Sequence, residues 1–284
     1  IAASWAFPMI WLQTDLQFQL MPPFIVGDEV PNVTSRLADA LKFSGIISIV
    51  YGGFCFLLPH TPPKKDATDQ LAFKKAFQLF RYSSFLVLVI ASLAVSIIHQ
   101  IYFLQTGPFL SSIGILDSQI GPAMTIGQFA EIITMAFLGY FLKDLGFKNV
   151  ISIGIAAYCL RYGIFGTVNL PLWVMVLSQA LHGICYAFFF AAAYIYVDKI
   201  ADEDVRHSAQ TVFGIIILGG GPVIGGWLSG YLQNKFTSVV RLPGPDIVSF
   251  DYSQFWYTLS IIGLITVVFF FSLFREQLSG VKSS

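Results

Sequence analysis

The sequence predicts an all-α polytopic membrane protein, and three observations support this prediction. Of its 284 residues, 56% are hydrophobic and only 11% are charged, whereas charged residues make up roughly 25% of a typical soluble domain. The mean hydropathy is +0.72, so a soluble protein of this size would expose many apolar side chains. The apolar residues also fall in runs that match the roughly 20-residue helix needed to cross a bilayer and exceed a barrel strand.

The composition excludes several other classes of protein. The 16 Lys and Arg residues balance the 16 Asp and Glu residues, so we expect no nucleic-acid partner. The three cysteines lie in apolar runs without CxxC spacing, which indicates neither a disulfide framework nor a zinc site. The nucleophile-elbow, zinc-protease and P-loop motifs are not found in the sequence. We therefore expect neither an enzyme nor a protein with a metal or other cofactor.

The apolar runs predict about eight transmembrane helices. The first run, 1–12, is about half a span long, so we expect it to be the end of a helix and the chain to be a fragment of a longer protein. Turn-forming pairs at 107–108 and 121–122, together with Gly146 and Pro171, separate several later runs. The seven further predicted spans are 43–58, 85–104, 122–141, 150–168, 171–197, 210–232 and 254–274.

The distribution of Lys and Arg predicts the orientation of the chain. Eleven of them lie in the 61–82 loop, two alternate loops and the C-terminal tail, and four lie in the intervening loops. Because cytoplasmic loops are rich in Lys and Arg, we expect the 61–82 loop and the C-terminus to be cytoplasmic. Six spans follow that loop, which favours a 6+6 transporter. Residues 1–60 would end its first half, 61–82 would connect the halves, and 83–284 would form the second half.

Two polar residues in the 122–141 span form the first candidate site. Glu131 lies near the middle of the span, and Gln128 lies one helical turn before it on the same face. An ionisable group inside the membrane is costly and is a functional hypothesis by default. One interpretation is an interhelical hydrogen bond. The other is a polar pair that lines a central cavity, where Glu131 accepts a proton or a substrate hydroxyl.

Other polar residues inside the spans add further candidates. Arg161 lies within 150–168 and predicts either an ion pair that locks two helices or a role in the cavity; a pair with Glu131 is possible. His182 and Tyr186 are four residues apart, so they share a helix face. His99 and Gln100 lie near the outer end of the 85–104 span. A lone membrane histidine is more often a packed, hydrogen-bonded group than a proton carrier.

Several motifs occur in order along nearly the whole chain: LPHTPP at 58–63, QFAE at 128–131, LRYGIF at 160–165, HGICYAFF at 182–189, YIYVDK at 194–199 and RHSAQ at 206–210. Together they resemble the nucleoside:proton symporter family of the major facilitator superfamily. Residues 139–148 (GYFLKDLGFK) also resemble the loop motif of that superfamily.

The resemblance implies a fold and a mechanism. The fold would be the major facilitator fold, truncated to about eight helices: the last two of the N-terminal half and the complete C-terminal half. The protein would be a monomer in the bacterial inner membrane that imports nucleosides with protons by alternating access, using the proton gradient and no cofactor. Gln100, Gln128, Glu131, His182 and Tyr186 would bind the nucleoside. Glu131 would also be the best candidate for proton coupling, with Arg161 as its partner or in a structural ion pair.

Two positions depart from the pattern of the family. The family commonly has Asp directly after the aromatic at Tyr186, where this sequence has Ala187, and often has Asn three residues after Gln100, where it has Phe103. These departures allow a permease for a sugar or another small polar solute on the same fold. A second alternative, of a different class, is a transporter-like sensor that does not transport.

Overall fold

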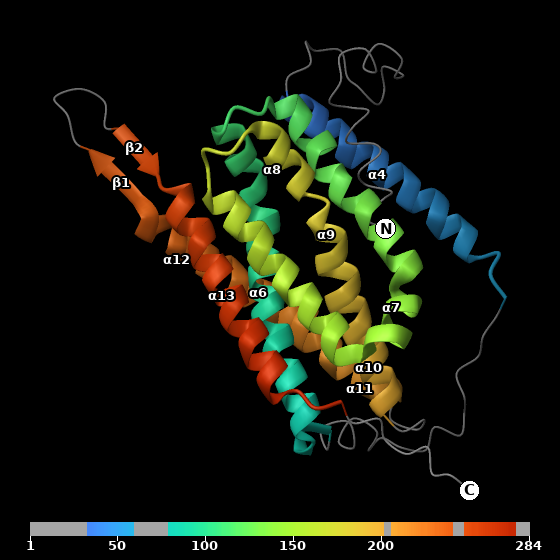
Figure 1. Ribbon diagram of the computed structural model, residues 1–284. Helices are drawn as coiled ribbons and strands as arrows, with labels where there is room; N and C mark the ends of the chain where they lie inside the picture. The colour runs from blue at the N-terminus through green and yellow to red at the C-terminus, as the bar shows by residue number, and fades with distance from the viewer. Residues whose placement is uncertain (1–32, 60–78, 202–205, 241–246, 277–284) are drawn as a thin grey trace, which may run out of the picture.

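The computed structural model describes residues 33–59, 79–201, 206–240 and 247–276, and this part of the chain is a bundle of long apolar helices (Figure 1). The prediction of a helical membrane protein is confirmed in this respect. Outside the helices lies a small antiparallel sheet of β1 (Thr237–Val240) and β2 (Ile247–Phe250), in which Thr237 pairs with Phe250. The expectation of an all-α chain missed this hairpin, because its short strands lie in a segment read only as a loop.

Five helical rods in the described residues are long and apolar enough to cross a membrane. Three are single helices or nearly so: α6 (Ser83–Ser112), α7 (Asp117–Gly166) and α13 (Tyr252–Leu273). The other two rods each contain a π-helical segment. One joins α8 (Leu172–Ser178), α9 (Leu181–Ile184), η2 (Cys185–Ala191) and α10 (Ala192–Ile200), and the next joins α11 (Arg206–Gly214), η3 (Ile215–Gly220) and α12 (Gly221–Phe236).

Helix α7 consists of two arms that meet at Gly146. Its 50 residues exceed twice the length of a membrane span, and Gly146 has the non-helical angles φ 75° and ψ 167°. Glycine adopts a positive φ without the steric penalty of a Cβ. Figure 1 shows the chain turning back at this point, near the end of the bundle where α10 ends. Six apolar segments therefore follow residue 82 in the described part, near the predicted positions.

Several predicted span edges are wrong. The expected break at 107–108 lies inside α6, which continues through Pro108 to Ser112. Pro108 stands only four residues before the helix end, so the hydrogen bond it removes belongs to the last turns. The pair 121–122 likewise lies within α7 and not before it. As a consequence, His99 and Gln100 lie near the middle of α6 instead of near its outer end.

The second predicted span, 43–58, overlaps a helix with other bounds. Helix α4 runs from Val33 to Cys55, which is 23 residues, and its described apolar part is Lys42–Cys55. Most of the described side chains of α4 are exposed, including Ile49 and Val50. The expected half-span at 1–12, most of the 61–82 loop and the end of the C-terminal tail lie outside the described residues.

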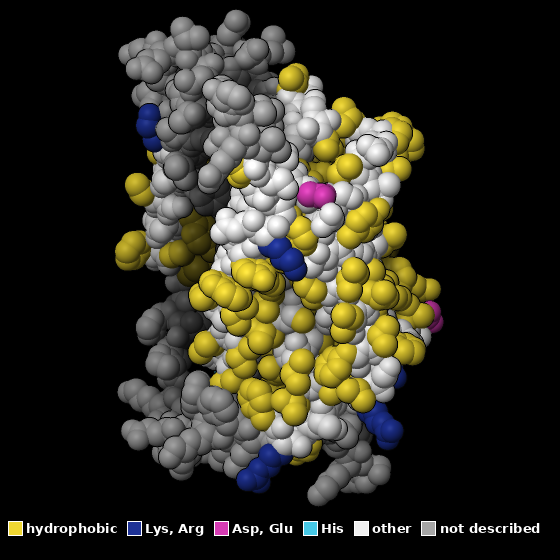
Figure 2. All heavy atoms as spheres, turned by 90° about the vertical axis from the view of Figure 1, so that its left-hand side faces the viewer, with side chains coloured by type: hydrophobic (Ala, Val, Ile, Leu, Met, Phe, Trp, Pro, Cys, Tyr) yellow, Lys and Arg dark blue, Asp and Glu magenta, His cyan; other side chains and the backbone are white. Residues whose placement is uncertain are grey.

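The core lies where α6 packs between α12 and α13 and where α7 packs against α13, α9 and η2. Trp256 of α13 is fully buried and contacts the rings of Phe109 from α6 and Phe165 from α7. The Tyr162 hydroxyl donates to the Ile98 carbonyl across the same interface, at 2.8 Å. Figure 2 shows mainly hydrophobic side chains on one outer face, as a lipid-facing surface requires.

Candidate functional site

The centre of the candidate site is Arg161, on the second arm of α7, whose side chain is fully buried. Its Nη1 lies 3.0 Å from Nδ1 of His182, and its Nη2 donates to Oε1 of Gln179. The guanidinium also lies over the ring of Tyr102, 3.8 Å from the centroid, a cation–π contact that strengthens when it is removed from water. A cation in the middle of the bundle is thus held by two neutral acceptors and an aromatic face.

His182 lies between this cation and Glu131. Its Nε2 is 3.9 Å from Oε2 of Glu131. Arg161 and Glu131 do not form the direct pair that was considered from the sequence; each contacts His182 instead. The Glu131 side chain is 16% exposed and that of His182 is 2% exposed, so the carboxylate is the accessible end of this row of three groups.

A close crossing of two helices brings Glu131 to His182. A Cβ placed on Gly183 of α9 would overlap the backbone carbonyl of Ala130 and come too near the Glu131 nitrogen on α7. Only glycine lets the two backbones approach this closely. Gly183 therefore permits the crossing, and the crossing places the adjacent His182 next to Glu131.

Aromatic rings surround the other face of His182. The His99 and His182 rings are nearly parallel, with centroids 5.6 Å apart and an interplanar angle of 8°. Tyr186 lies 6.1 Å from His99 and 6.4 Å from His182. Phe103 and Phe190 contact the edge or face of His99 at 5.0 and 4.9 Å. Such a group of rings offers stacking surfaces for a planar heterocycle.

The two candidate glutamines occupy different places. Gln128 lies one turn before Glu131, and its buried Oε1 has no hydrogen-bond partner in the described part of the chain. Gln100 lies beside α12, where a Cβ on Gly225 would come 2.9 Å from the Gln100 Cβ. The described contacts thus place Gln128 with Glu131 on α7, and Gln100 on the α12 side of α6, away from the rings that His99 contacts.

The structure also locates the two positions where the sequence departs from the family pattern. Ala187 is fully buried, so it faces the helix packing. Phe103 is 49% exposed and contacts the rings of His99 and His182. At position 103, therefore, this chain extends the aromatic group instead of adding an amide.

Two members of the cluster, Gln179 and Tyr102, were not among the residues predicted from the sequence. Gln179 accepts from both Arg161 and the Tyr102 hydroxyl, the latter at 3.0 Å. It is a polar residue well inside the apolar run 171–197, so the argument used for Glu131 could have found it. His99 has the hydrogen bond expected of a packed membrane histidine, because its Nδ1 lies 2.7 Å from the Tyr158 hydroxyl.

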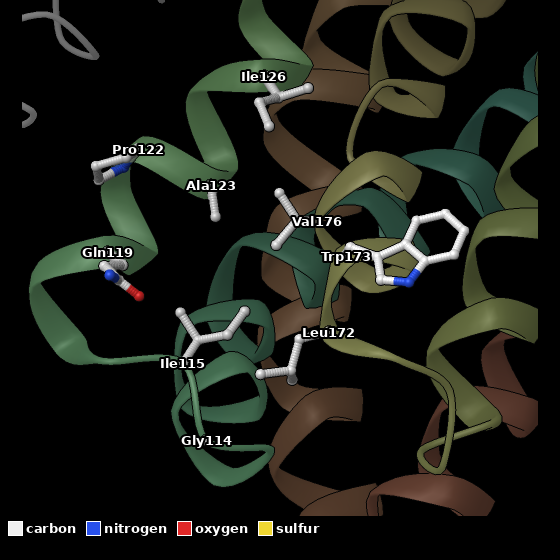
Figure 3. A pocket seen from close by; sticks show the side chains of 9 residues that line it. All are labelled: Gly114, Ile115, Gln119, Pro122, Ala123, Ile126, Leu172, Trp173 and Val176. Atoms are coloured by element: carbon white, nitrogen blue, oxygen red, sulfur yellow. The ribbon is translucent and has the colours of Figure 1, made fainter.

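A separate cavity of about 390 Å³ lies between the start of α7 and α8 (Figure 3). Apart from Gln119, the side chains that line it are apolar or aromatic, and none of the candidate residues is among them. Val176 precedes Gln179 by three residues, so the cavity lies about one helical turn from the cluster toward the end of the bundle. It is lined by Gly114, Ile115, Gln119, Pro122, Ala123, Ile126, Leu172, Trp173 and Val176.

Comparisons with known proteins place this chain among transporters. It is 32% identical to the putative nucleoside transporter YegT of Escherichia coli (strain K12). The 277 aligned residues cover 94% of this chain and 63% of the relative. It is 26% identical over 262 residues to the nucleoside permease NupG of the same strain, covering 84% of this chain and 58% of that protein. The chain thus spans about six-tenths of the length of these relatives.

The fold is also similar to that of solved transporters. A crystal structure of a point mutant of the nucleoside transporter NupG matches with a TM-score of 0.70 at 24% identity, over 85% of this chain and 61% of that chain. A second NupG crystal structure matches with a TM-score of 0.66 at 22% identity, over 86% of this chain and 61% of that one. At these identities the likeness establishes the fold.

The match to a protein family covers most of the sequence. Residues 22–279 match the family described as nucleoside H+ symporter, and this range includes every helix in the described part of the chain and the whole candidate cluster. The resemblance drawn from the motifs at 128–131, 160–165 and 182–189 is confirmed: this chain is a multi-pass membrane protein that belongs to the nucleoside H+ symporter family.

Proposed function

We propose that the complete protein imports nucleosides together with protons. The observation that supports this most strongly is the convergence of a partly exposed carboxylate, Glu131, with a buried His182 and a group of aromatic rings in the middle of the apolar bundle. The family to which the chain belongs is described as nucleoside H+ symporters. The named relatives are transporters or permeases.

The cluster offers suitable chemistry for each part of a nucleoside. The rings of Phe103 and Tyr186, which are partly exposed, can stack on the base, at roughly 1–3 kcal/mol for each stacked base. His182 lies between the rings of His99 and Tyr102 and can contact the base only through its ring edge. The Glu131 carboxylate can accept hydrogen bonds from ribose hydroxyls, and the Gln128 amide can pair with a base edge. Gln100 would contact the substrate only from the α12 side.

Glu131 is the proposed site of proton coupling. It is the acidic group of the cluster, and its side chain is partly exposed, so a proton can reach it without passing through the packed core. Protonation of Glu131 would remove the negative charge beside His182, and release of the proton would restore that charge. Arg161 remains fixed by its neutral partners during this cycle.

The proposed architecture follows the pattern of a 6+6 transporter. Residues 83–284 would form the second six-helix half, 61–82 the cytoplasmic connection and 1–60 the end of the first half, with the substrate bound between the halves. The protein would be a monomer in the bacterial inner membrane with a cytoplasmic C-terminus, driven by the proton gradient without a cofactor.

The direct test is uptake of labelled uridine or adenosine by the complete protein in liposomes. We expect accumulation when the outside is more acidic than the inside, and much less without a gradient. Uptake that ignores the gradient would contradict symport. Uptake that glucose inhibits better than unlabelled nucleosides would favour the sugar permease, and nucleoside binding without accumulation would favour the sensor.

A further inference from the structure

His182 has a different partner on each of its ring nitrogens. Nδ1 lies 3.0 Å from Nη1 of Arg161, and Nε2 lies 3.9 Å from Oε2 of Glu131. The first distance is that of a hydrogen bond, and the second is longer than one. The ring is therefore bonded on its Arg161 side, and its Nε2 points toward Glu131 without being bound to it.

The chemistry of Arg161 determines which nitrogen carries the proton. A guanidinium has only N–H donors and no acceptor. The Nδ1 atom must therefore accept the hydrogen bond through its lone pair, since two donors would repel each other. In the neutral ring the single proton is then on Nε2.

Arg161 is held so that it cannot turn away from His182. Gln179 accepts from Nη2, and Tyr102 both stacks under the guanidinium and donates its hydroxyl to Gln179. Phe165 lies on the guanidinium as well, 5.5 Å from its ring centroid. These contacts, with Arg161 fully buried, fix the direction of its N–H groups.

We propose that Arg161 is a positioning residue that holds His182 in its Nε2–H form, so that the site presents a hydrogen-bond donor beside Glu131. That donor selects substrates with an acceptor at this point, such as a base carbonyl or a ring nitrogen of a nucleoside. The effect on substrate rests on the proposed nucleoside transport, whereas the state of His182 does not.

The state of His182 can be read by NMR of the complete protein labelled with ¹⁵N and ¹³C in histidine, with the signal assigned through His182→Gln. We expect the Nε2–H tautomer in the wild type and a mixture of tautomers in Arg161→Met. Tyr102→Phe keeps the ring under Arg161 and is expected to keep the tautomer.

Two results would overturn the proposal. One is a wild-type His182 that carries its proton on Nδ1 or is doubly protonated, and the other is an Arg161→Met protein with an unchanged tautomer. Should Arg161→Met fail to fold, the wild-type spectrum decides alone, because a proton on Nδ1 is incompatible with donation from Arg161.

Transport kinetics supply the second readout. Loss of one well-placed donor weakens binding by about fivefold, so Arg161→Met should raise KM for nucleosides by about this factor with Vmax nearly unchanged. Arg275→Gln, an exposed arginine after α13, should change neither. A lower Vmax at unchanged KM would contradict the positioning role. A wild-type protein that transports no nucleoside would refute the proposed function and leave the tautomer result standing.

Discussion

Two arginines in this chain meet very different surroundings. Arg206 begins α11 and lies 3.6 Å from the Asp198 carboxylate of α10, with both side chains about 40% exposed (37% and 41%). Arg161 is fully buried and contacts neutral groups, Gln179, His182 and the Tyr102 ring. The exposed Arg206 thus contacts a carboxylate directly, whereas His182 lies between the buried Arg161 and the Glu131 carboxylate.

The two arginines differ in how much their partners contribute to the stability of the protein. An exposed ion pair contributes about 0–1 kcal/mol because water already solvates both groups. A buried cation depends on each of its hydrogen-bond partners, and a hydrogen bond to a charged group contributes roughly 1.5–3 kcal/mol. The Arg161 cluster is therefore sensitive to small changes, whereas the Asp198–Arg206 pair tolerates them.

The largest effect is expected for Gln179→Leu. This change removes the acceptor of both Arg161 and the Tyr102 hydroxyl and leaves a buried cation short of a partner. We expect a loss of stability of roughly 3–4 kcal/mol, because one charged and one neutral hydrogen bond are lost, measured by thermal unfolding in detergent. The matched control is Gln105→Leu, because buried Gln105 donates to neutral Ser229 at 2.9 Å and should lose only about 1 kcal/mol. Equal losses would show that the charge of Arg161 is not the reason.

Gly183→Ala should have the next largest effect. The added Cβ would overlap the Ala130 carbonyl and push α7 away from α9, which separates Glu131 from His182. Overpacking of this kind costs about 1–3 kcal/mol, and nucleoside uptake should fall more than the amount of folded protein. In Gly139→Ala, on the same first arm of α7, the new Cβ meets open space, and both quantities should be unchanged. Normal uptake by Gly183→Ala would mean that the crossing is not needed.

Asp198→Asn should have the smallest effect. The exposed pair with Arg206 is lost, while the Gln210 amide, which donates to Asp198 Oδ1 at 3.0 Å, can still bond to the asparagine oxygen. We expect less than about 1 kcal/mol, and a difference from the wild type that shrinks as salt is raised. Thermal unfolding at low and high salt measures this. A loss as large as that of Gln179→Leu would contradict the contrast between the two regions.

The fold was largely predictable because each membrane-length helix corresponds to an apolar run in the sequence. The runs located the rods from Ser83 to Leu273, and Gly146 marked the turn inside α7. The sequence could not locate the end of α6, because the helix continues through Pro108, a residue that usually interrupts a helix outside its first turn. It also could not reveal the β1–β2 hairpin, whose four-residue strands are too short for a clear alternating pattern.

The candidate site was predictable by residue type and not by partner. Glu131, Arg161 and His182 stood out as polar groups within apolar spans, but no spacing along the chain told that His182 lies between the other two. Those contacts depend on the crossing at Gly183, which joins residues some fifty positions apart. Gln179 followed the same rule as Glu131 and was overlooked.

The most direct test of the proposed coupling compares two kinds of transport by Glu131→Gln in the same liposomes. Glutamine keeps the shape of the side chain but cannot exchange a proton. We predict that uridine counterflow without a pH gradient persists, while accumulation driven by the gradient falls to the level seen without one. Glu276→Gln, which alters an exposed carboxylate after α13, should keep both. Gradient-driven accumulation that survives in Glu131→Gln would contradict the assignment of proton coupling to Glu131.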